Sequence, residues 1–174
     1  MIVHSLAGLS ESLSTGAVTS EVLTRGCLAA ISDPQGEGSR TFLHVNRDGA
    51  LATARAIDDM RAADVPLPPL AGIPISVKDL FDIAGEVTRA GSTVLANNAP
   101  AVNDAPVVAR LRRAGLIVIG RTNMTEFAFS GLGLNPHYGT PAAPWDRDAR
   151  HIPGGSSSGA AISVSDGMCF GALG

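Results

Sequence analysis

The sequence has 174 residues, of which 45% are hydrophobic and 17% are charged, and its formal net charge is −3. This length suits one domain, and the apolar fraction is large enough to supply a buried core. The acidic balance, without any run of Lys or Arg, argues against a general nucleic-acid surface. Neither a long apolar span nor a signal peptide is visible, so we expect a cytoplasmic protein without membrane partners.

The first third of the chain has the apolar spacing of helices. This spacing predicts helices over about residues 5–13, 20–31 and 48–61, with Thr19 or Ser20 capping the second. Residues 1–4 lead directly into the first helix. The segment 41–45 predicts a short strand, and the proline-rich segment 66–70 predicts a stiff connector. We therefore expect a helical lead-in over about residues 1–65.

From about residue 70 the pattern alternates between strands and helices. Apolar runs at 73–77 and 116–119 predict two buried strands, with a helix over 104–114 between them. Strand, helix and strand at this spacing imply parallel pairing with a right-handed crossover. A short helix is expected over 124–127, an irregular segment over 132–150, and a further helix after residue 159. The part over about residues 70–174 is therefore expected to be α/β.

One lysine stands at a position where α/β sheets carry their chemistry. Lys78 follows the apolar run 73–77 and ends the predicted strand. Open α/β sheets bind ligands beyond the carboxyl ends of their strands. A lysine that is partly desolvated at such a place favours its neutral, basic form. The alternative is a surface lysine beside Asp79 and Asp82.

The second candidate is the run 153–159, which reads Pro-Gly-Gly-Ser-Ser-Ser-Gly. The two glycines free the backbone, and three hydroxyls then stand at what we predict to be a helix start. Free N–H groups at a helix start favour an anion or the handling of a hydroxyl proton. Lysine with serine is one variant of the serine-plus-base arrangement. The alternative is an ordinary helix cap after the glycine turn.

Three segments in this order and spacing resemble the amidase signature family. They are 73–79, which contains Lys78; 120–128, which reads Gly-Arg-Thr-Asn-Met-Thr-Glu-Phe-Ala; and 153–159. The resemblance runs from about Leu6 to Gly174. It implies an α/β fold with a mixed sheet flanked by helices. The chain would be the N-terminal part, residues 1–174, of a single domain of this kind.

The resemblance implies amide hydrolysis by a Ser–cisSer–Lys triad. Lys78 falls on the family's lysine, and Ser156 falls on the bridging serine that follows a cis peptide bond, here Gly155–Ser156. The family's nucleophile is a later serine, in a turn that follows an Ala-Leu-Gly like that at 172–174. The resemblance therefore implies that these 174 residues carry the base and the proton bridge, lack the nucleophile, and are inactive alone. It implies no metal and no cofactor.

The resemblance also implies a substrate region next to the segment 120–128. Ser157 is open between helix capping and substrate contact. The residues that the resemblance places along the substrate pocket are Ala128, Phe129, Ser130 and Gly131.

Three polar residues near this region have simpler readings. Asn123 and Glu126 fit a helix start with its first-turn acid as well as they fit the border of a pocket. The resemblance gives histidine no catalytic role, so we expect His137 to pack beside Tyr138 in a loop.

Two further sets of residues invite functional readings that the sequence does not favour. Arg110, Arg112 and Arg113 are expected to form a solvated helix face. Cys27 and Cys169 lie in apolar surroundings without metal-like partners, so we expect both to pack in the core.

Two alternatives to a hydrolase stay open. The chain could be a non-catalytic assembly unit that docks through an unpaired sheet edge. It could also be an A-type subunit of glutamyl-tRNA amidotransferase, which the family includes, although the chain offers no basic surface. The expected partners are a small-molecule amide and the remainder of the amidase or a second copy of the chain.

Overall fold

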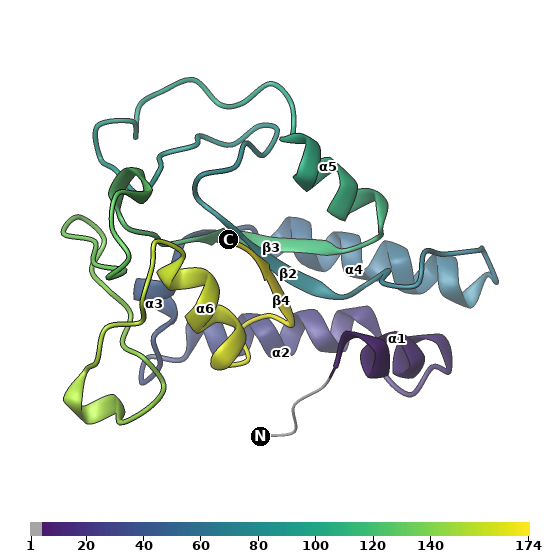
Figure 1. Cartoon of the computed structure of the whole chain (residues 1–174). Coiled ribbons are helices and arrows are strands. Elements are labelled where there is room, and N and C mark those ends of the chain that lie inside the picture. Colours follow the sequence, from purple (N-terminus) through teal and green to yellow (C-terminus); the bar gives the residue numbers. More distant parts are fainter. Residues whose placement is uncertain (1–4) are drawn as a thin grey trace.

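The computed structural model describes residues 5–174 and contains a mixed four-stranded sheet flanked by helices (Figure 1). The strand order is β1-β3-β2-β4; β2 runs parallel to β3 and β4, whereas β1 runs antiparallel to β3. The α/β class and the parallel pairing predicted for 73–77 with 116–119 are confirmed. In chain order the elements are α1 Leu6–Ser14, α2 Ser20–Ser32, α3 Gly38–Thr41, β1 Phe42–Val45, α4 Arg47–Ala62, β2 Pro74–Lys78, α5 Pro106–Arg113, β3 Ile117–Thr122, the 3-10 turns η1 Glu126–Ala128 and η2 Arg147–Ala149, α6 Ser158–Ser165 and β4 Gly171–Leu173.

Polar side chains cap three of the four N-terminal helices, namely α1, α2 and α4. Ser5, Thr19 and Asn46 each accept a hydrogen bond from the backbone N–H three residues later, at 3.1–3.2 Å. These bonds satisfy donors that a helix leaves free at its start. The three predicted helices consequently form within one residue of their expected bounds.

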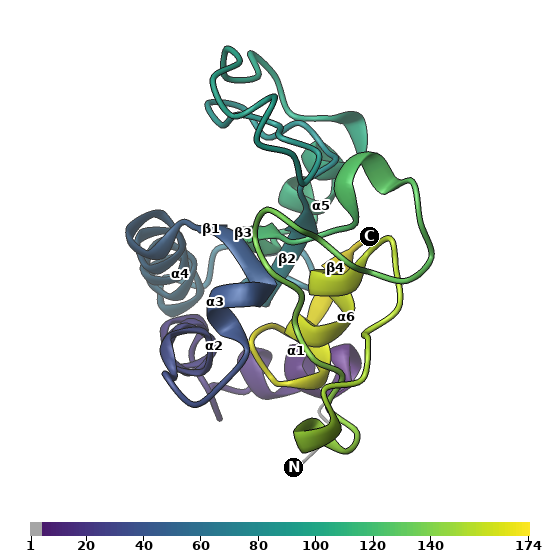
Figure 2. The same ribbon diagram turned by 90° about the vertical axis from the view of Figure 1, so that its left-hand side faces the viewer.

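The helices cover both faces of the sheet (Figure 2). Leu28 of α2 and Ala54 of α4 pack with Ile119 of β3, whereas Val108 of α5 packs with Val77 of β2. Val118 contacts the cluster of α5, and alternate side chains of a strand point to opposite faces. The sheet is therefore buried from both sides, which explains why all five residues of β2 are buried.

Three elements are not predicted from the sequence because they are too short to show an apolar periodicity. They are α3, η2 and β4. Thr41, expected in the strand, ends α3 instead. The helix expected over 124–127 is the 3-10 turn η1, since Phe127 and Ala128 have φ values of 51° and 59°. Positive φ is unfavourable for such residues and interrupts a right-handed helix.

The expected core packing of the two cysteines and the expected exposure of the arginine cluster 110–113 are confirmed. Cys27 and Cys169 are 2% and 1% exposed, and burial raises the pKa of the Cys27 thiol to about 12. Neither thiol is therefore ionised near neutral pH. Arg110, Arg112 and Arg113 are exposed on α5.

Between residues 5 and 174, no helix has the length and apolar character that crossing a membrane requires. The expectations for residues 1–4, that they enter the first helix directly and form no signal peptide, lie outside the described residues. A cytoplasmic location stays a prediction, as do the boundaries near residues 65 and 70 and the extent of a single domain.

A close approach at the start of α6 generates a stability prediction. A Cβ added to Gly159 would lie 2.6 Å from the backbone N of Asn123 and 2.5 Å from the carbonyl O of Thr41. Gly159→Ala should therefore lower the free energy of unfolding by about 1–3 kcal/mol, the usual cost of overpacking. Urea denaturation followed by circular dichroism measures this change.

Gly26 provides the matched control. It lies exposed in the middle of α2, and a Cβ added there meets no atom within 4 Å. Gly26→Ala should raise the free energy of unfolding by about 0.5–1 kcal/mol, because alanine loses less backbone entropy in a helix. Equal effects of the two substitutions would contradict the packing argument.

Candidate active site

Lys78 ends β2 and is buried. It is 5% exposed, and the strand register places it beside Thr122 at the carboxyl ends of two parallel strands. Burial penalises the charged ammonium and lowers the pKa of the amine below its ordinary value. The alternative of a surface lysine is therefore wrong. Lys78 is also the only lysine in the sequence.

The neighbouring carboxylate of Asp79 is engaged elsewhere. Asp79 Oδ1 accepts from Arg121 Nε at 2.7 Å, and Oδ2 accepts from the backbone N of Gly91 at 3.0 Å. Successive residues of a strand point to opposite faces, so Lys78 and Asp79 serve different sides of the sheet. The buried Arg121–Asp79 ion pair thus leaves the amine of Lys78 without a carboxylate partner from the next residue.

The turn 153–157 brings two hydroxyls to the amine. Lys78 Nζ donates to Ser156 Oγ at 2.8 Å and to Ser157 Oγ at 2.9 Å. The Gly155–Ser156 peptide bond is cis, as the family resemblance implied. Lys78 and Ser156 lie 78 positions apart in the chain, yet their polar atoms are within proton-transfer distance.

Two glycines allow the backbone conformation of the turn 153–157. Gly154 has a φ of 76°, which favours glycine. A Cβ added to Gly155 would lie 2.6 Å from the backbone N of Gly133 and 2.7 Å from its Cα. The turn therefore lies directly on the backbone of the loop that follows η1, and any side chain at Gly155 would separate the two.

Ser157 has a role that the sequence left open. It stands at the N-cap position of α6, but its side chain makes no capping hydrogen bond. Its hydroxyl accepts from Lys78 instead. The capping alternative is therefore wrong, and the substrate contact stays a prediction. The sequence signal that could have suggested this contact is the adjacency of Ser156 and Ser157 before the helix, since two neighbouring hydroxyls can share one donor.

The segment 123–125 fixes the position of the turn. The backbone N of Thr125 donates to the carbonyl O of Ser156 at 3.0 Å, and the backbone N of Gly159 donates to the carbonyl O of Asn123 at 2.9 Å. The side chain of Asn123 donates to the carbonyl O of Arg40 at 2.8 Å. Asn123 is thus a buried connector between the N-terminal helices and the start of α6.

Glu126 and His137 form a separate polar cluster. Glu126 Oε1 accepts from Ser92 Oγ at 2.7 Å and lies 2.8 Å from His137 Nε2. The hydrogen bond from Ser92 and then that from His137 lower the pKa of Glu126. The rings of His137 and Tyr138 meet edge to face, with centroids 6.5 Å apart, which confirms the expected packing.

The predicted substrate region lies on the chain just after Thr125. Ala128 and Ser130 are half-buried, Gly131 is exposed, and the side chain of Phe129 is 94% exposed. This loop leads into Gly133, which contacts Gly155. The structure therefore places the loop beside the turn, while its role in substrate binding stays a prediction.

A cavity of about 470 Å³ lies at the other end of the sheet. It is bordered by α4, the connector after it and the start of β3, whereas Lys78 stands at the strand ends. Apart from Arg112 and Arg113 its lining carries no ionisable side chain. Within residues 5–174 no three His, Cys, Asp or Glu residues form a cluster that could hold a metal ion.

A model of the protein family described as Amidase matches residues 25–174. The chain belongs to this family. Among its curated amidase-family relatives is the A subunit of glutamyl-tRNA(Gln) amidotransferase from Cupriavidus necator, 41% identical over 172 residues, which cover 99% of this chain and 33% of the relative. The same subunit from Streptomyces coelicolor is 39% identical over 159 residues, 91% of this chain and 31% of the relative.

Solved amidase structures share the fold. The peptide amidase from Stenotrophomonas maltophilia is 34% identical with a TM-score of 0.85, covering 97% of this chain and 35% of that one. A chain from a vestigial protein complex, connected with the origins of an s-triazine catabolic enzyme, is 36% identical with a TM-score of 0.88, covering 95% and 36%. The chain spans about a third of the length of the curated relatives it matches.

The buried amine generates a prediction that needs no turnover. If the chain is produced with isotope-labelled lysine, its NMR spectrum should show a single lysine side-chain signal, because Lys78 is the only lysine. Its NMR titration should have a midpoint below 10.5, the ordinary value, since burial disfavours the ammonium. Urea-unfolded chain is the control and should titrate at the ordinary value. A folded midpoint at or above that value would contradict the site.

Proposed function

We propose that the complete protein hydrolyses an amide C–N bond through a Ser–cisSer–Lys triad, in which Lys78 is the base and Ser156 the proton bridge. One observation carries this proposal: the buried amine of Lys78 lies 2.8 Å from the hydroxyl of Ser156. Membership in the amidase family supports the reaction class.

The protonation state of Lys78 decides whether it can act as a base. A general base must be neutral at the working pH, and burial of Lys78 favours the neutral amine. The neutral amine can accept the proton of Ser156 while Ser156 takes a proton from a second hydroxyl. Ser157 also contacts the amine and orients it between two oxygens.

The proposed reaction proceeds as an acyl transfer. The nucleophilic hydroxyl attacks the amide carbonyl, loses its proton through Ser156 to Lys78, and forms an ester with the acyl group. The C–N bond breaks as the relay returns a proton to the leaving amine. Water repeats the sequence on the ester, which releases a carboxylate and restores the hydroxyl.

The nucleophile in this proposal belongs to the part of the longer relatives that this chain does not span. Gly174 lies against Ser157, because a Cβ added to Gly174 would be 2.9 Å from Ser157 Oγ. Gly174 also follows β4, which pairs in parallel with β2. A residue following Gly174 would therefore enter the site beside Ser157, within reach of the proton bridge.

The proposed substrate is a small amide that contacts the loop 128–131 and Ser157. Phe129 offers an exposed aromatic ring at this loop. The proposed macromolecular partner is the remainder of the amidase or a second copy of the chain, docked at the sheet edge formed by β4. Ala172 in the middle of β4 is exposed, consistent with an open edge.

A second candidate function is that of an A-type amidotransferase subunit, since the curated relatives carry that name. The net charge of −3 gives this chain no general attraction for transfer RNA. The two functions separate by experiment. A hydrolase acts on free small amides without another subunit, whereas an amidotransferase subunit requires its partners and a charged transfer RNA for product formation.

Removal of the base tests the main proposal. In the complete protein, Lys78→Ala and Ser156→Ala should each lower kcat for amide hydrolysis by about 10²- to 10⁴-fold, the usual contribution of proton transfer. Initial rates of amine release measure this loss, with circular dichroism to verify folding.

Ser12→Ala is the matched control for loss of a hydroxyl. Ser12 lies in α1 and its hydroxyl donates to the carbonyl O of Gly8 at 2.9 Å, away from the amine. Its kcat should stay near that of the parent protein. Near-normal turnover by a folded Lys78→Ala protein would refute the assignment of the base.

A further inference from the structure

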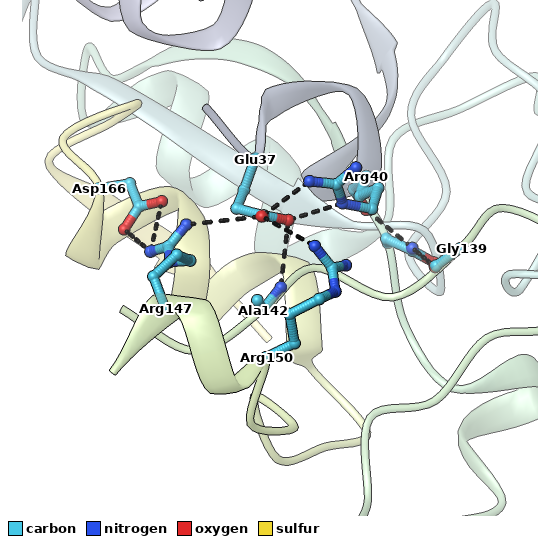
Figure 3. A network of polar contacts seen from close by, with 8 residues as sticks. Glu37, Arg40, Gly139, Ala142, Arg147, Arg150 and Asp166 are labelled. Carbon is cyan, nitrogen blue, oxygen red and sulfur yellow. Dashed lines mark hydrogen bonds and ion pairs between the residues drawn. The ribbon is translucent and has the colours of Figure 1, made fainter. Parts of the chain in front are cut away.

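A buried carboxylate holds together segments that are far apart in the sequence (Figure 3). Glu37 precedes α3, and its side chain is 5% exposed. Both of its oxygens accept from Arg40, at 2.7 Å each. Oε2 also accepts from the backbone N of Ala142 at 3.1 Å. A buried carboxylate is costly unless it is paired and hydrogen-bonded, so these contacts account for its presence.

Two further arginines reach the same carboxylate from the segment 142–150. Arg147 Nη1 lies 3.8 Å and Arg150 Nη1 lies 4.0 Å from Glu37 Oε1. Arg147 Nη2 also contacts both oxygens of Asp166, at 2.8 and 3.0 Å. Arg147 therefore joins Glu37 to the end of α6, as Figure 3 shows.

The charges around Glu37 favour its ionised form. The hydrogen bonds from Arg40, and to a smaller extent that from Ala142, lower the pKa of Glu37. Three arginines surround two carboxylates in this cluster, so loss of Glu37 would leave like charges close together. Their repulsion would act on the segment 142–150, which lacks regular structure apart from η2.

This segment leads directly into the turn that carries the hydroxyls. The backbone N of Ala143 donates to the carbonyl O of His151 at 2.9 Å and closes the segment at its base. The turn 153–157 begins two residues later. At its other end, α6 begins with Ser158 and finishes at Ser165, next to Asp166. Both sides of the turn are therefore tied to Glu37, one through Ala142 and Arg150, the other through Arg147.

We propose that Glu37 is a positioning residue for the active site: it clamps the segment 142–150 and the end of α6, so that Ser156 and Ser157 meet Lys78. The effect of this clamp on catalysis rests on the proposed function, whereas the contacts that Glu37 makes do not depend on it. Glu37 lies outside all three motifs that carry the family resemblance. Its effect on Lys78 is indirect, through the path of the backbone.

Glu21 offers a matched control carboxylate. It contacts two arginines, Arg25 at 2.7 Å and Arg55 at 2.9 Å, but links only α2 and α4 at the surface. Glu37→Gln and Glu21→Gln each remove one negative charge that faces guanidinium groups. The two substitutions therefore disconnect different segments. Glu37→Gln weakens the contacts on either side of the turn 153–157, whereas Glu21→Gln does not.

The titration of the single lysine reads out the position of the turn without any catalysis. In folded Glu37→Gln the pKa of Lys78 should rise toward its ordinary value, because a displaced turn admits water to the amine. The backbone amides of Thr125 and Gly159, which donate to the carbonyl O of Ser156 and of Asn123 and so hold the turn, should exchange hydrogen about tenfold faster, as expected when local opening becomes easier. In Glu21→Gln both measurements should match the parent chain.

Arg147→Met keeps the proposal testable if Glu37→Gln does not fold. It leaves the Glu37–Arg40 pair intact, removes the link to Asp166, and should produce the same changes at Lys78 and at the amides of Thr125 and Gly159. An unchanged Lys78 titration and unchanged exchange in a folded variant of either kind would overturn the positioning role. Failure of the catalytic proposal has a different signature, namely normal turnover after Lys78→Ala in the complete protein.

Discussion

The hydrogen bonds from the amine of Lys78 to two adjacent hydroxyls connect the end of β2 with the start of α6. These elements are distant in the chain, and each needs the other. The buried amine requires polar partners, while the turn requires something to hold its serines at the strand end. The sheet supplies the rigid side of this contact, since β2 is paired on both edges and buried throughout.

The opposite face of the same strand end is fixed by a full ion pair. Arg121 is 2% exposed and donates to Asp79, and its second nitrogen Nη2 donates to the carbonyl O of Phe81 at 2.9 Å. This arrangement orders the chain where it leaves β2. It also keeps the side chain of Asp79 away from that of Lys78, so the environment of the amine is governed by burial and by the two hydroxyls. The strand end thus has the Arg121–Asp79 ion pair on one face and the buried amine of Lys78 on the other.

How much of this the sequence could reveal depends on the range of the interactions. Local signals were sufficient for α1, α2 and α4, because Ser5, Thr19 and Asn46 cap their own helices. The apolar run before Lys78 located the strand end. The meeting of Lys78 with Ser156 came from the family resemblance, since no local rule connects two positions so far apart.

Other features depend on tertiary contacts that leave little trace in the pattern. The helix α3 has only four residues, with Gly38 packed against the backbone of Ile31. Glu37 looks like a loop residue in the sequence, and its arginine partners Arg147 and Arg150 lie more than a hundred positions away. The partnership of Ser157 with Lys78 likewise required the path of the turn. Charge and spacing alone do not encode such a path.

The contact between Gly133 and Gly155 has a consequence for how the site could be redesigned. Neither backbone leaves space for a side chain between them, so the loop at 128–133 and the serine turn form one mechanical unit. Under the proposed function, a change that reshapes the loop to admit a different acyl group would also shift Ser156, the proposed proton bridge. The proposed function therefore couples selectivity to turnover, and altering one independently would require a compensating change where Gly133 meets Gly155.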